Sequence, residues 1–300
     1  APAGCKDSSI GKVLVVRGGA IGDFVLTLPA LHALRGSSDQ LAVLGSSAVA
    51  PLAVAGGLAD EWRSLEGREW ASWFVADDTC DPETAGWLSK FDTVISYLHD
   101  PESVFECSIK KVKQLRYVTG PYKPSGQHIT TTLAAPLQEL GVIQFAELFR
   151  LEVPHVKLSW PGNWLAIHPG SGSEQKNWAE ENWQNLIQRI NTRTNWNILL
   201  TAGEVEAERV DRFVADLPPT RVAKAYEWSL VRLAGALANC SLFAGVDSGI
   251  RHLAEAVGLS GVAIWGESNV LEWGPRDERW EIFHGLETTS VDTMFMALMK

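Results

Sequence analysis

The sequence predicts an α/β protein made of two units of similar size. Short β-branched and aliphatic runs alternate with helical segments, a pattern typical of parallel sheets. Each half opens with a strand, a glycine-rich loop and a helix, in that order. At about 100–200 residues per domain, the 300 residues are also enough for two hydrophobic cores.

The first half begins with a β-branched run suited to a buried strand at residues 12–17. The glycine loop 18–22 follows, and residues 23–35 are predicted to be helical. Pro29 is expected to kink that helix or to mark a first turn, because proline removes a backbone donor and clashes with the preceding turn. Further strands are expected at 41–44 and 92–97, with a tryptophan-rich stretch at 63–75.

The pattern restarts after residues 154–162, a proline-flanked segment without periodicity that we interpret as a linker. We therefore expect one domain at 1–155 and a second at 156–300. The second opens with a predicted strand at 165–168, a glycine-rich loop at 169–173 and a helix at 180–192. One face of that helix carries Trp183, Leu186, Ile187 and Ile190. Later strands are expected at 197–201, 241–245 and 261–265, and helices at 252–257 and 291–299.

Composition excludes several classes of protein. With 46% hydrophobic and 21% charged residues, the chain can bury enough apolar surface to fold. Its net charge of -10 argues against a nucleic-acid partner, because phosphate-binding surfaces are basic. Cys5, Cys80, Cys107 and Cys240 form no CxxC pair, which fits a reducing cytosol better than a disulfide framework or zinc site.

No segment resembles a membrane span or a signal peptide. The uncharged stretch 41–59 contains Pro51, three glycines and many alanines, so a strand, a turn and a short helix explain it better. The first twelve residues have no apolar core. We expect a soluble, cytoplasmic protein.

Asp23 ends the first glycine loop, at the start of a predicted helix. Backbone N–H groups at such a helix start can face a ligand. The glycines at 18, 19 and 22 do not form the GxGxxG fingerprint of dinucleotide sites. Asp23 is therefore either an acid that stabilises the first helical turn or a carboxylate placed to act on a ligand.

The second glycine loop is suited to a diphosphate. His168 ends a strand, small residues follow, and Lys176 precedes the next helix. Hydroxyl and amide donors at 171–173, together with the lysine charge, match phosphate oxygens. The alternative is a surface turn with a solvated lysine. His168 itself is interpreted as a packed residue at a strand end.

A third segment, GVDSGIRH at 245–252, follows another apolar strand. Asp247 and Ser248 are expected at the carboxyl edge of a parallel sheet, where ligands of such sheets bind. The carboxylate could accept hydrogen bonds from sugar hydroxyls, and His252 lies one helical turn further on. The alternative is a helix-capping aspartate followed by a solvent-facing histidine.

Other catalytic patterns are absent from the sequence. It contains no DxD, no HExxH and no histidine or cysteine cluster with metal-ligand spacing. It also lacks the GxSxG elbow of serine hydrolases and the GxxxxGK[ST] loop of P-loop proteins. No metal site and no cofactor are expected, so a departing phosphate would be stabilised by Lys176 and a helix end.

Taken together, these segments resemble glycosyltransferase family 9, the ADP-heptose:lipopolysaccharide heptosyltransferases. The similarity rests on VLVVRGGAIGDFVLTLPALHALR, then LAIHPGSGSEQKNWAEENW, then FAGVDSGIRHLAEAVG with AIWGESNVLEWGPR. It implies a GT-B fold of two Rossmann-like domains facing a central cleft. The first domain would bind the acceptor and the second the nucleotide-sugar donor, with the C-terminal helix returning to the first domain. One departure is Gly266-Glu-Ser-Asn269, where the family usually has a Gly-Pro-Thr turn.

The resemblance also implies an activity: inverting, metal-independent transfer of a sugar, heptose from ADP-heptose, onto a lipopolysaccharide-core or related glycan. Asp23 matches the family's proposed general base. The donor-binding positions fall on Ser171, Gly172, Lys176, Trp228, Asp247, Ser248, Gly249 and His252. A glutamate that contacts the ribose is expected among Glu204, Glu206 and Glu208.

Two other functions remain open from the sequence: a nucleotide-sugar binding protein without transfer activity, and a nucleotide-sugar epimerase of the same fold. The acceptor is also open. Basic residues gather at Lys110, Lys111, Lys113, Arg116 and Lys123, with Arg63 and Arg68 in the tryptophan-rich stretch. They are either a solvated surface or a face for an anionic glycan or glycolipid, with peripheral contact to the inner membrane leaflet.

Overall fold

The computed structural model describes residues 9–75, 80–203 and 206–300. Cys5 and Glu204 lie outside these ranges. The chain divides into two compact units, Ala1–Phe149 and Arg150–Lys300. The sequence had placed the domain boundary slightly later, between residues 155 and 156. The linker predicted at 154–162 contains neither helix nor strand.

The first unit contains a five-stranded parallel sheet. Its strands are β1 (Lys12–Arg17), β2 (Gln40–Gly45), β3 (Glu61–Ser64), β4 (Thr93–Ser96) and β5 (Arg116–Thr119). Their spatial order is β3-β2-β1-β4-β5. The central strands are nearly continuous apolar runs because helices cover both faces of the sheet. The strand predictions at 12–17, 41–44 and 92–97 are confirmed.

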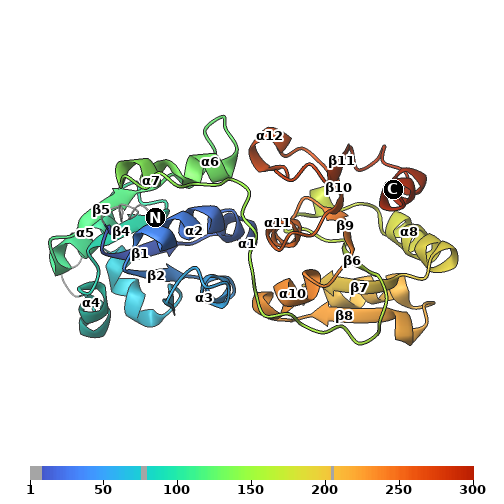
Figure 1. Cartoon of the computed structure of the whole chain (residues 1–300), viewed down its shortest axis with the longest axis horizontal. Coiled ribbons are helices and arrows are strands. Elements are labelled where there is room, and N and C mark those ends of the chain that lie inside the picture. The colour runs from blue at the N-terminus through green and yellow to red at the C-terminus, as the bar shows by residue number, and fades with distance from the viewer. Residues whose placement is uncertain (1–8, 76–79, 204–205) are drawn as a thin grey trace, which may run out of the picture. The chain divides into compact units, whose positions relative to one another are not determined.

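The helices of this unit are α1 (Ile21–Val25), α2 (Leu28–Ser37), α3 (Pro51–Ala55), α4 (Pro82–Leu88), α5 (Val104–Val112), α6 (Ile129–Leu133) and α7 (Ala135–Glu139). The single helix predicted at 23–35 is divided in two. Pro29 is the second residue of α2, so it begins a new helix as expected of proline. Helices α6 and α7 lie beside α2 (Figure 1).

Tryptophans form much of the core on one face of this sheet. Trp70 and Trp73 belong to a 3-10 helix at Arg68–Phe74, and Trp87 belongs to α4. The Trp70 ring lies 5.8 Å from that of Trp73 and 5.9 Å from that of Trp87. All three are almost fully buried with Leu14 and Val16 of β1. Aromatic rings of this size stabilise a core through large buried apolar areas.

The second unit contains a six-stranded parallel sheet. Its strands are β6 (Trp164–His168), β7 (Asn197–Ala202), β8 (Val222–Tyr226), β9 (Leu242–Val246), β10 (Gly261–Trp265) and β11 (Trp280–His284). The order β8-β7-β6-β9-β10-β11 is that of a Rossmann sheet. The strands not predicted from the sequence, β3, β5, β8 and β11, all lie at or near a sheet edge. Their mixed burial explains why they lack a continuous apolar run.

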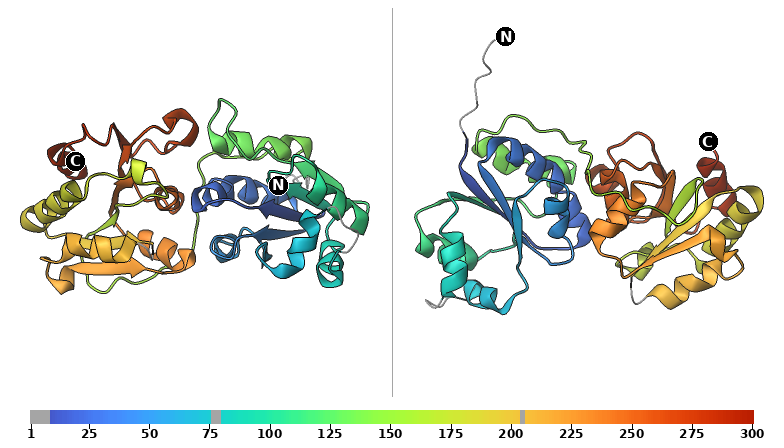
Figure 2. Two further views of the ribbon diagram at one scale, coloured as in Figure 1. Left: turned by 180° about the vertical axis from the view of Figure 1, so that it is seen from behind. Right: turned by 60° about the horizontal axis from the view of Figure 1, so that its bottom comes forward.

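The helices of this unit are α8 (Glu180–Arg193), α9 (Ala207–Asp211), α10 (Leu230–Leu237), α11 (Gly249–Ala256), α12 (Val270–Trp273) and α13 (Val291–Leu298). The apolar face predicted for α8 is buried as expected. Helix α13 lies beside α8 in both orientations (Figures 1 and 2), and its Met294 and Leu298 belong to the same core. The buried face of α13 thus packs within the second unit. The return of this helix to the first domain, which the resemblance implies, stays a prediction.

No helix among the described residues is long and apolar enough to span a membrane.

Candidate functional site

Both sheets have a point at which the strand order reverses, between β1 and β4 in the first and between β6 and β9 in the second. Loops that leave adjacent strands there in opposite directions open a crevice at the carboxyl edge, where ligands of such folds bind. The three segments singled out in the sequence follow β1, β6 and β9. The topology thus places each of them at a binding edge.

Asp23 is the third residue of α1 and has a structural role there. Its Oδ2 accepts a hydrogen bond from the backbone N–H of Ala20 at 2.9 Å, which stabilises the helix start. Its Oδ1 lies 3.5 Å from Nη2 of Arg17. The side chain remains 28% exposed, against 3% for Arg17. The carboxylate is therefore fixed in position and still reachable from solvent.

Gly19 makes room for this carboxylate. Its φ of +98° is a conformation that favours glycine. A Cβ at this position would lie 2.6 Å from Oδ2 of Asp23, well inside contact distance. A glycine is thus required both by the backbone conformation and by the close approach of the acid.

Arg17 is a site residue that sequence reasoning missed. It ends β1, and its guanidinium donates to the backbone oxygen of Asp23 at 3.2 Å and to that of Tyr97 at 3.3 Å. Burial lowers the pKa of Arg17, and the neighbouring Asp23 acts in the opposite direction. Arg17 therefore ties the end of β1 to the end of β4. The sequence feature that could have identified Arg17 is a charged residue at the end of an otherwise apolar strand.

The loop after β6 is organised by Ser171. Its hydroxyl lies 2.6 Å from the backbone oxygen of Ser173 and 3.0 Å from Oδ1 of Asn177, and it also accepts from the Ser173 N–H. The hydroxyl therefore holds the loop in shape. Gly172 is exposed, and nothing lies within 4 Å of where its Cβ would be. A ligand could approach the backbone closely at this point.

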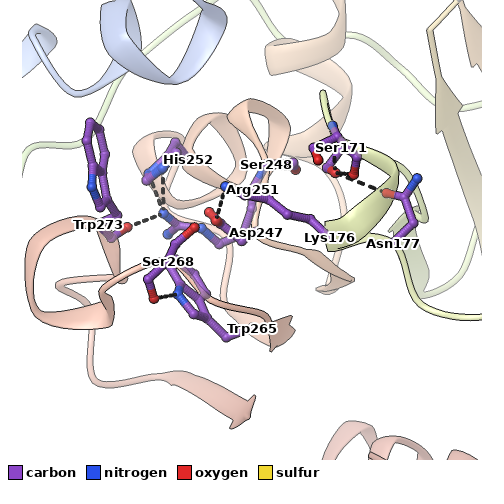
Figure 3. Close-up of polar contacts among 11 residues, drawn as sticks. Ser171, Lys176, Asn177, Asp247, Ser248, Arg251, His252, Trp265, Ser268 and Trp273 are labelled. Atoms are coloured by element: carbon purple, nitrogen blue, oxygen red, sulfur yellow. Dashed lines mark hydrogen bonds and ion pairs between the residues drawn. The ribbon is translucent and has the colours of Figure 1, made fainter. Parts of the chain in front are cut away.

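Lys176 and Asp247 form an ion pair across the β6–β9 reversal point. Figure 3 shows the lysine side chain extending from its loop to the carboxylate that follows β9. The distance from Nζ to Oδ2 is 2.7 Å. Asp247 is 8% exposed and Lys176 38%, so the acid is buried and its cation partly open to solvent. Residues predicted separately from two motifs are thus brought together by the fold.

The residues after Asp247 begin α11. Ser248, and not Asp247, caps this helix, by accepting from the backbone N–H of Arg251 at 3.2 Å. Gly249 is the first helical residue. His252 is only 5% exposed, so the alternative of a solvent-facing histidine is wrong. The helix-capping role that the sequence suggests for Asp247 is therefore filled by Ser248.

Arg251 is a second buried arginine that sequence reasoning missed. It is 0% exposed and pairs with Glu255, Nη1 to Oε2, at 2.7 Å. Its Nη2 donates to the backbone oxygen of Trp273 at 3.0 Å and contacts the His252 ring (Figure 3). Burial lowers the Arg251 pKa, and Glu255 and Asp247 oppose this effect. Arg251 thus links the start of α11 to the end of α12.

Trp228 follows β8 and is half-buried. The Arg232 guanidinium carbon lies 3.7 Å from the centroid of the indole ring, a close cation–π contact. Glu206 follows β7, and its carboxylate lies so close to Gly170 that a Cβ there would overlap it. Glu208 is exposed. Of the two described glutamates, Glu206 therefore lies against the glycine-rich loop.

His168 is buried at the end of β6 and is 7% exposed. Its Nδ1 lies 2.8 Å from the Thr201 hydroxyl oxygen. Burial lowers the pKa of His168 from 6.5 to about 4, so the ring is neutral near pH 7. The interpretation of His168 as a packed residue at a strand end is confirmed.

The basic residues of the first unit are largely paired. Lys110 pairs with Glu106, Lys113 with Asp92, Arg116 with Glu139 and Arg63 with Glu83. The ammonium of Lys123 lies 5.3 Å from the centroid of the Tyr122 ring. Arg68 is exposed. Because neighbouring acids offset most of these charges, the positive surface is weaker than the sequence indicates.

Within residues 9–75, 80–203 and 206–300, no group of three or more histidine, cysteine, aspartate or glutamate side chains is arranged to hold a metal ion.

Comparison with known proteins agrees with the sequence resemblance. The sequence model of glycosyltransferase family 9 (heptosyltransferase) matches residues 144–293. Lipopolysaccharide heptosyltransferase 1 of Pseudomonas aeruginosa is 25% identical over 289 residues, covering 86% of this chain and 79% of that protein.

Solved structures show the same fold. A glycosyl transferase family 9 protein from Veillonella parvula has a TM-score of 0.79 at 17% identity, over 97% of both chains. The E. coli ADP-heptose lps heptosyltransferase II has a TM-score of 0.73 at 13% identity, over 96% of this chain and 97% of that one. The predicted fold class, α/β of the GT-B type with two Rossmann-like units, is confirmed.

Proposed function

The chain belongs to glycosyltransferase family 9 and is a glycosyltransferase of the heptosyltransferase type. We propose that it transfers heptose from ADP-heptose to a lipopolysaccharide-core glycan, with inversion at the anomeric carbon. The observation that carries the proposal is the Lys176–Asp247 pair at the β6–β9 reversal point. A cation beside a glycine-rich loop suits a diphosphate, and a buried carboxylate suits sugar hydroxyls. The names of the E. coli and Pseudomonas relatives support heptose and lipopolysaccharide as substrates.

The second unit would bind the donor. We assign the diphosphate to Lys176 and to the loop of Ser171 and Gly172. Asp247, Ser248, Gly249 and His252 would contact the sugar and phosphates. The nucleobase would lie at Trp228. Glu206 is favoured over Glu208 for the ribose because its carboxylate lies against Gly170 of the glycine-rich loop, whereas Glu208 is exposed.

The first unit would bind the acceptor and supply the general base. Asp23 would accept the proton of the acceptor hydroxyl as that oxygen attacks the anomeric carbon. The bond from that carbon to the leaving ADP breaks, and Lys176 stabilises the negative charge that develops on the diphosphate. In this proposal no metal ion and no cofactor are needed, since the lysine supplies the positive charge.

The acceptor is proposed to be an anionic glycolipid, reached from the cytoplasmic side by peripheral contact with the inner leaflet. Arg63 lies in β3 and pairs with Glu83, and the exposed Arg68 lies four residues after the end of that strand. The carboxyl end of β3 is at the same edge of the sheet as Asp23. The charges of the two arginines would attract acceptor phosphate or carboxylate groups.

Replacement of Asp23 tests the proposal. Asp23→Asn keeps a group that can cap α1 but removes the base, so turnover of ADP-heptose with a lipopolysaccharide-core acceptor should fall by about 10²–10⁴. ADP binding should be unchanged. Asp39→Asn, at an exposed aspartate of the same unit, is the matched control.

Mass analysis of the products separates the other functions. A new glycosidic linkage supports transfer, a free epimer would indicate an epimerase, and ADP binding without any product would indicate a binding protein. Activity that disappears with EDTA and returns with a divalent cation would contradict the metal-independent mechanism. Unchanged turnover of Asp23→Asn would contradict the role assigned to the base.

A further inference from the structure

The first unit contains a cavity of about 800 Å³ at the carboxyl ends of β4 and β5. The loops after these strands line one side of it, and residues of α6 and α7 line another. Its volume is within the range of small-molecule sites, roughly 300–1,000 Å³. No residue implied by the family resemblance lines this cavity.

The lining is polar but almost without charge. Residues with hydroxyl or amide side chains line the cavity, and of these the Thr131 hydroxyl donates to Glu147. They are Thr119, Ser125, Gln127, Thr131, Thr132 and Gln138. The described residues that line it include no lysine and no arginine. The nearby Lys123, which does not line the cavity, lies over the Tyr122 ring. Such a set of neutral donors and acceptors fits an uncharged polar ligand.

The one carboxylate in the lining is held by a helix start. Oδ1 of Asp100 accepts from the backbone N–H of Val104 at 2.9 Å, and Oδ2 from that of Glu106 at 3.0 Å. These bonds keep the carboxylate in place at the N-terminal end of α5. A fixed negative charge of this kind disfavours a phosphate or carboxylate in the same cavity.

Aromatic rings form one wall. The rings of His99 and Tyr122 lie 4.7 Å apart and are tilted by 44°. Tyr122 is half-buried, so part of its side chain is exposed to a ligand, beside the Lys123 ammonium that lies over its ring. An aromatic side chain with an apolar body and a polar tip suits pyranose rings, which have both apolar faces and hydroxyl edges.

A chain of contacts joins the cavity to the loop that carries the proposed base. Leu98, which lines it, packs against Gly18, where a Cβ would lie 3.2 Å from Cδ2 of the leucine. The preceding residue, Tyr97, accepts from Arg17, which also binds the backbone of Asp23. A ligand in the cavity would therefore lie beside the loop that carries the base.

We propose that this cavity binds an uncharged pyranose residue of the acceptor and presents its hydroxyl toward Asp23. The inference rests on the proposed function for the identity of the reaction, and the mostly neutral polar lining supports the chemical class of the ligand. Charged groups of the acceptor would lie outside the cavity.

Saturation-transfer NMR on the full chain tests this with two matched probes, methyl α-D-mannopyranoside and the corresponding methyl mannopyranosiduronate. The neutral probe should bind at least about tenfold more tightly. Tyr122→Ala should weaken its binding about tenfold by removing the aromatic wall. Gln127→Lys should bring the uronate to at least equal affinity, whereas Gln114→Lys, at an exposed glutamine outside the cavity, should not.

Equal binding of both probes, binding of neither, or binding unaffected by Tyr122→Ala and Gln127→Lys would each overturn the inference. ADP titration of every variant, together with thermal unfolding, reports separately on the second unit and on folding. If the neutral probe binds as described but ADP-heptose is never consumed, the proposed transferase reaction fails while the cavity remains a site for neutral sugars.

Discussion

Nζ of Lys176 lies 2.7 Å from Oδ2 of Asp247, although 71 residues separate them in the chain. The two strands that precede them, β6 and β9, are adjacent in the sheet, and their loops meet at the edge where the strand order reverses. The lysine charge compensates that of the buried carboxylate, and the lysine side chain remains partly exposed to solvent. An incoming diphosphate would therefore meet a cation that is already positioned.

We expect Lys176→Gln to lower turnover by about 10²–10³, because a charge that stabilises the leaving group is lost. ADP affinity should fall as well. The matched control is Lys224→Gln, which breaks an ion pair of the same type with Asp211 in which both partners are 45% exposed. Steady-state kinetics and ADP titration check the prediction, and an equal effect of the two substitutions would contradict it.

Arg17→Met should lower kcat by about 10–100-fold with little change in KM for ADP-heptose, because in the proposed function Arg17 positions Asp23 and the second unit binds the donor. Loss of buried donors to two carbonyl oxygens should also cost about 1–3 kcal/mol of unfolding free energy. Arg35→Met, at an exposed pair with Asp60, serves as the control. Adding Asp23→Asn to Arg17→Met should lower kcat little beyond Asp23→Asn alone, and fully additive losses would refute the positioning role.

Arg251→Lys should destabilise the second unit, because lysine cannot reproduce the forked contacts to Glu255, Trp273 and His252. Chemical unfolding should show a loss of about 3 kcal/mol, typical of disrupting a buried charge network. Arg212→Lys, at an exposed pair with Glu180, should have a much smaller effect. Similar stabilities for the two variants would show that the buried arginine is dispensable.

The buried His168 should make stability depend on pH. Its pKa is about 4 in the folded chain and near 6.5 when unfolded, so the unfolded state takes up the proton first as pH falls. Its contribution is complete above pH 6.5 and is lost between 6.5 and 4, a change of about 3 kcal/mol. His168→Asn should remove that part of the slope when unfolding is measured across this range. An unchanged slope would mean that another group is responsible.

Local patterns in the sequence were sufficient for the central elements of the fold. A buried parallel strand needs an uninterrupted apolar run, and β1, β2, β6, β7, β9 and β10 all have one. Edge strands such as β8 and β11 have mixed burial and gave no comparable signal. Of the two alternatives predicted for Pro29, a kink or a first helical turn, the structure has the first turn, because proline acts on its own turn.

The sequence by itself determined which residues have side chains suited to binding or acid–base chemistry. Asp23, Lys176, Asp247 and the two glycine-rich loops can all be recognised because they follow predicted strands. Only the tertiary structure decided that Lys176 and Asp247 form one pair, that Arg17 and Arg251 are buried, and that a mostly neutral polar cavity forms at the carboxyl ends of β4 and β5. The physical reason is that strand order in a parallel sheet is set by long-range packing. Residues that meet at the carboxyl edge of the sheet can therefore be far apart in the sequence, and the sequence alone does not show that they are in contact.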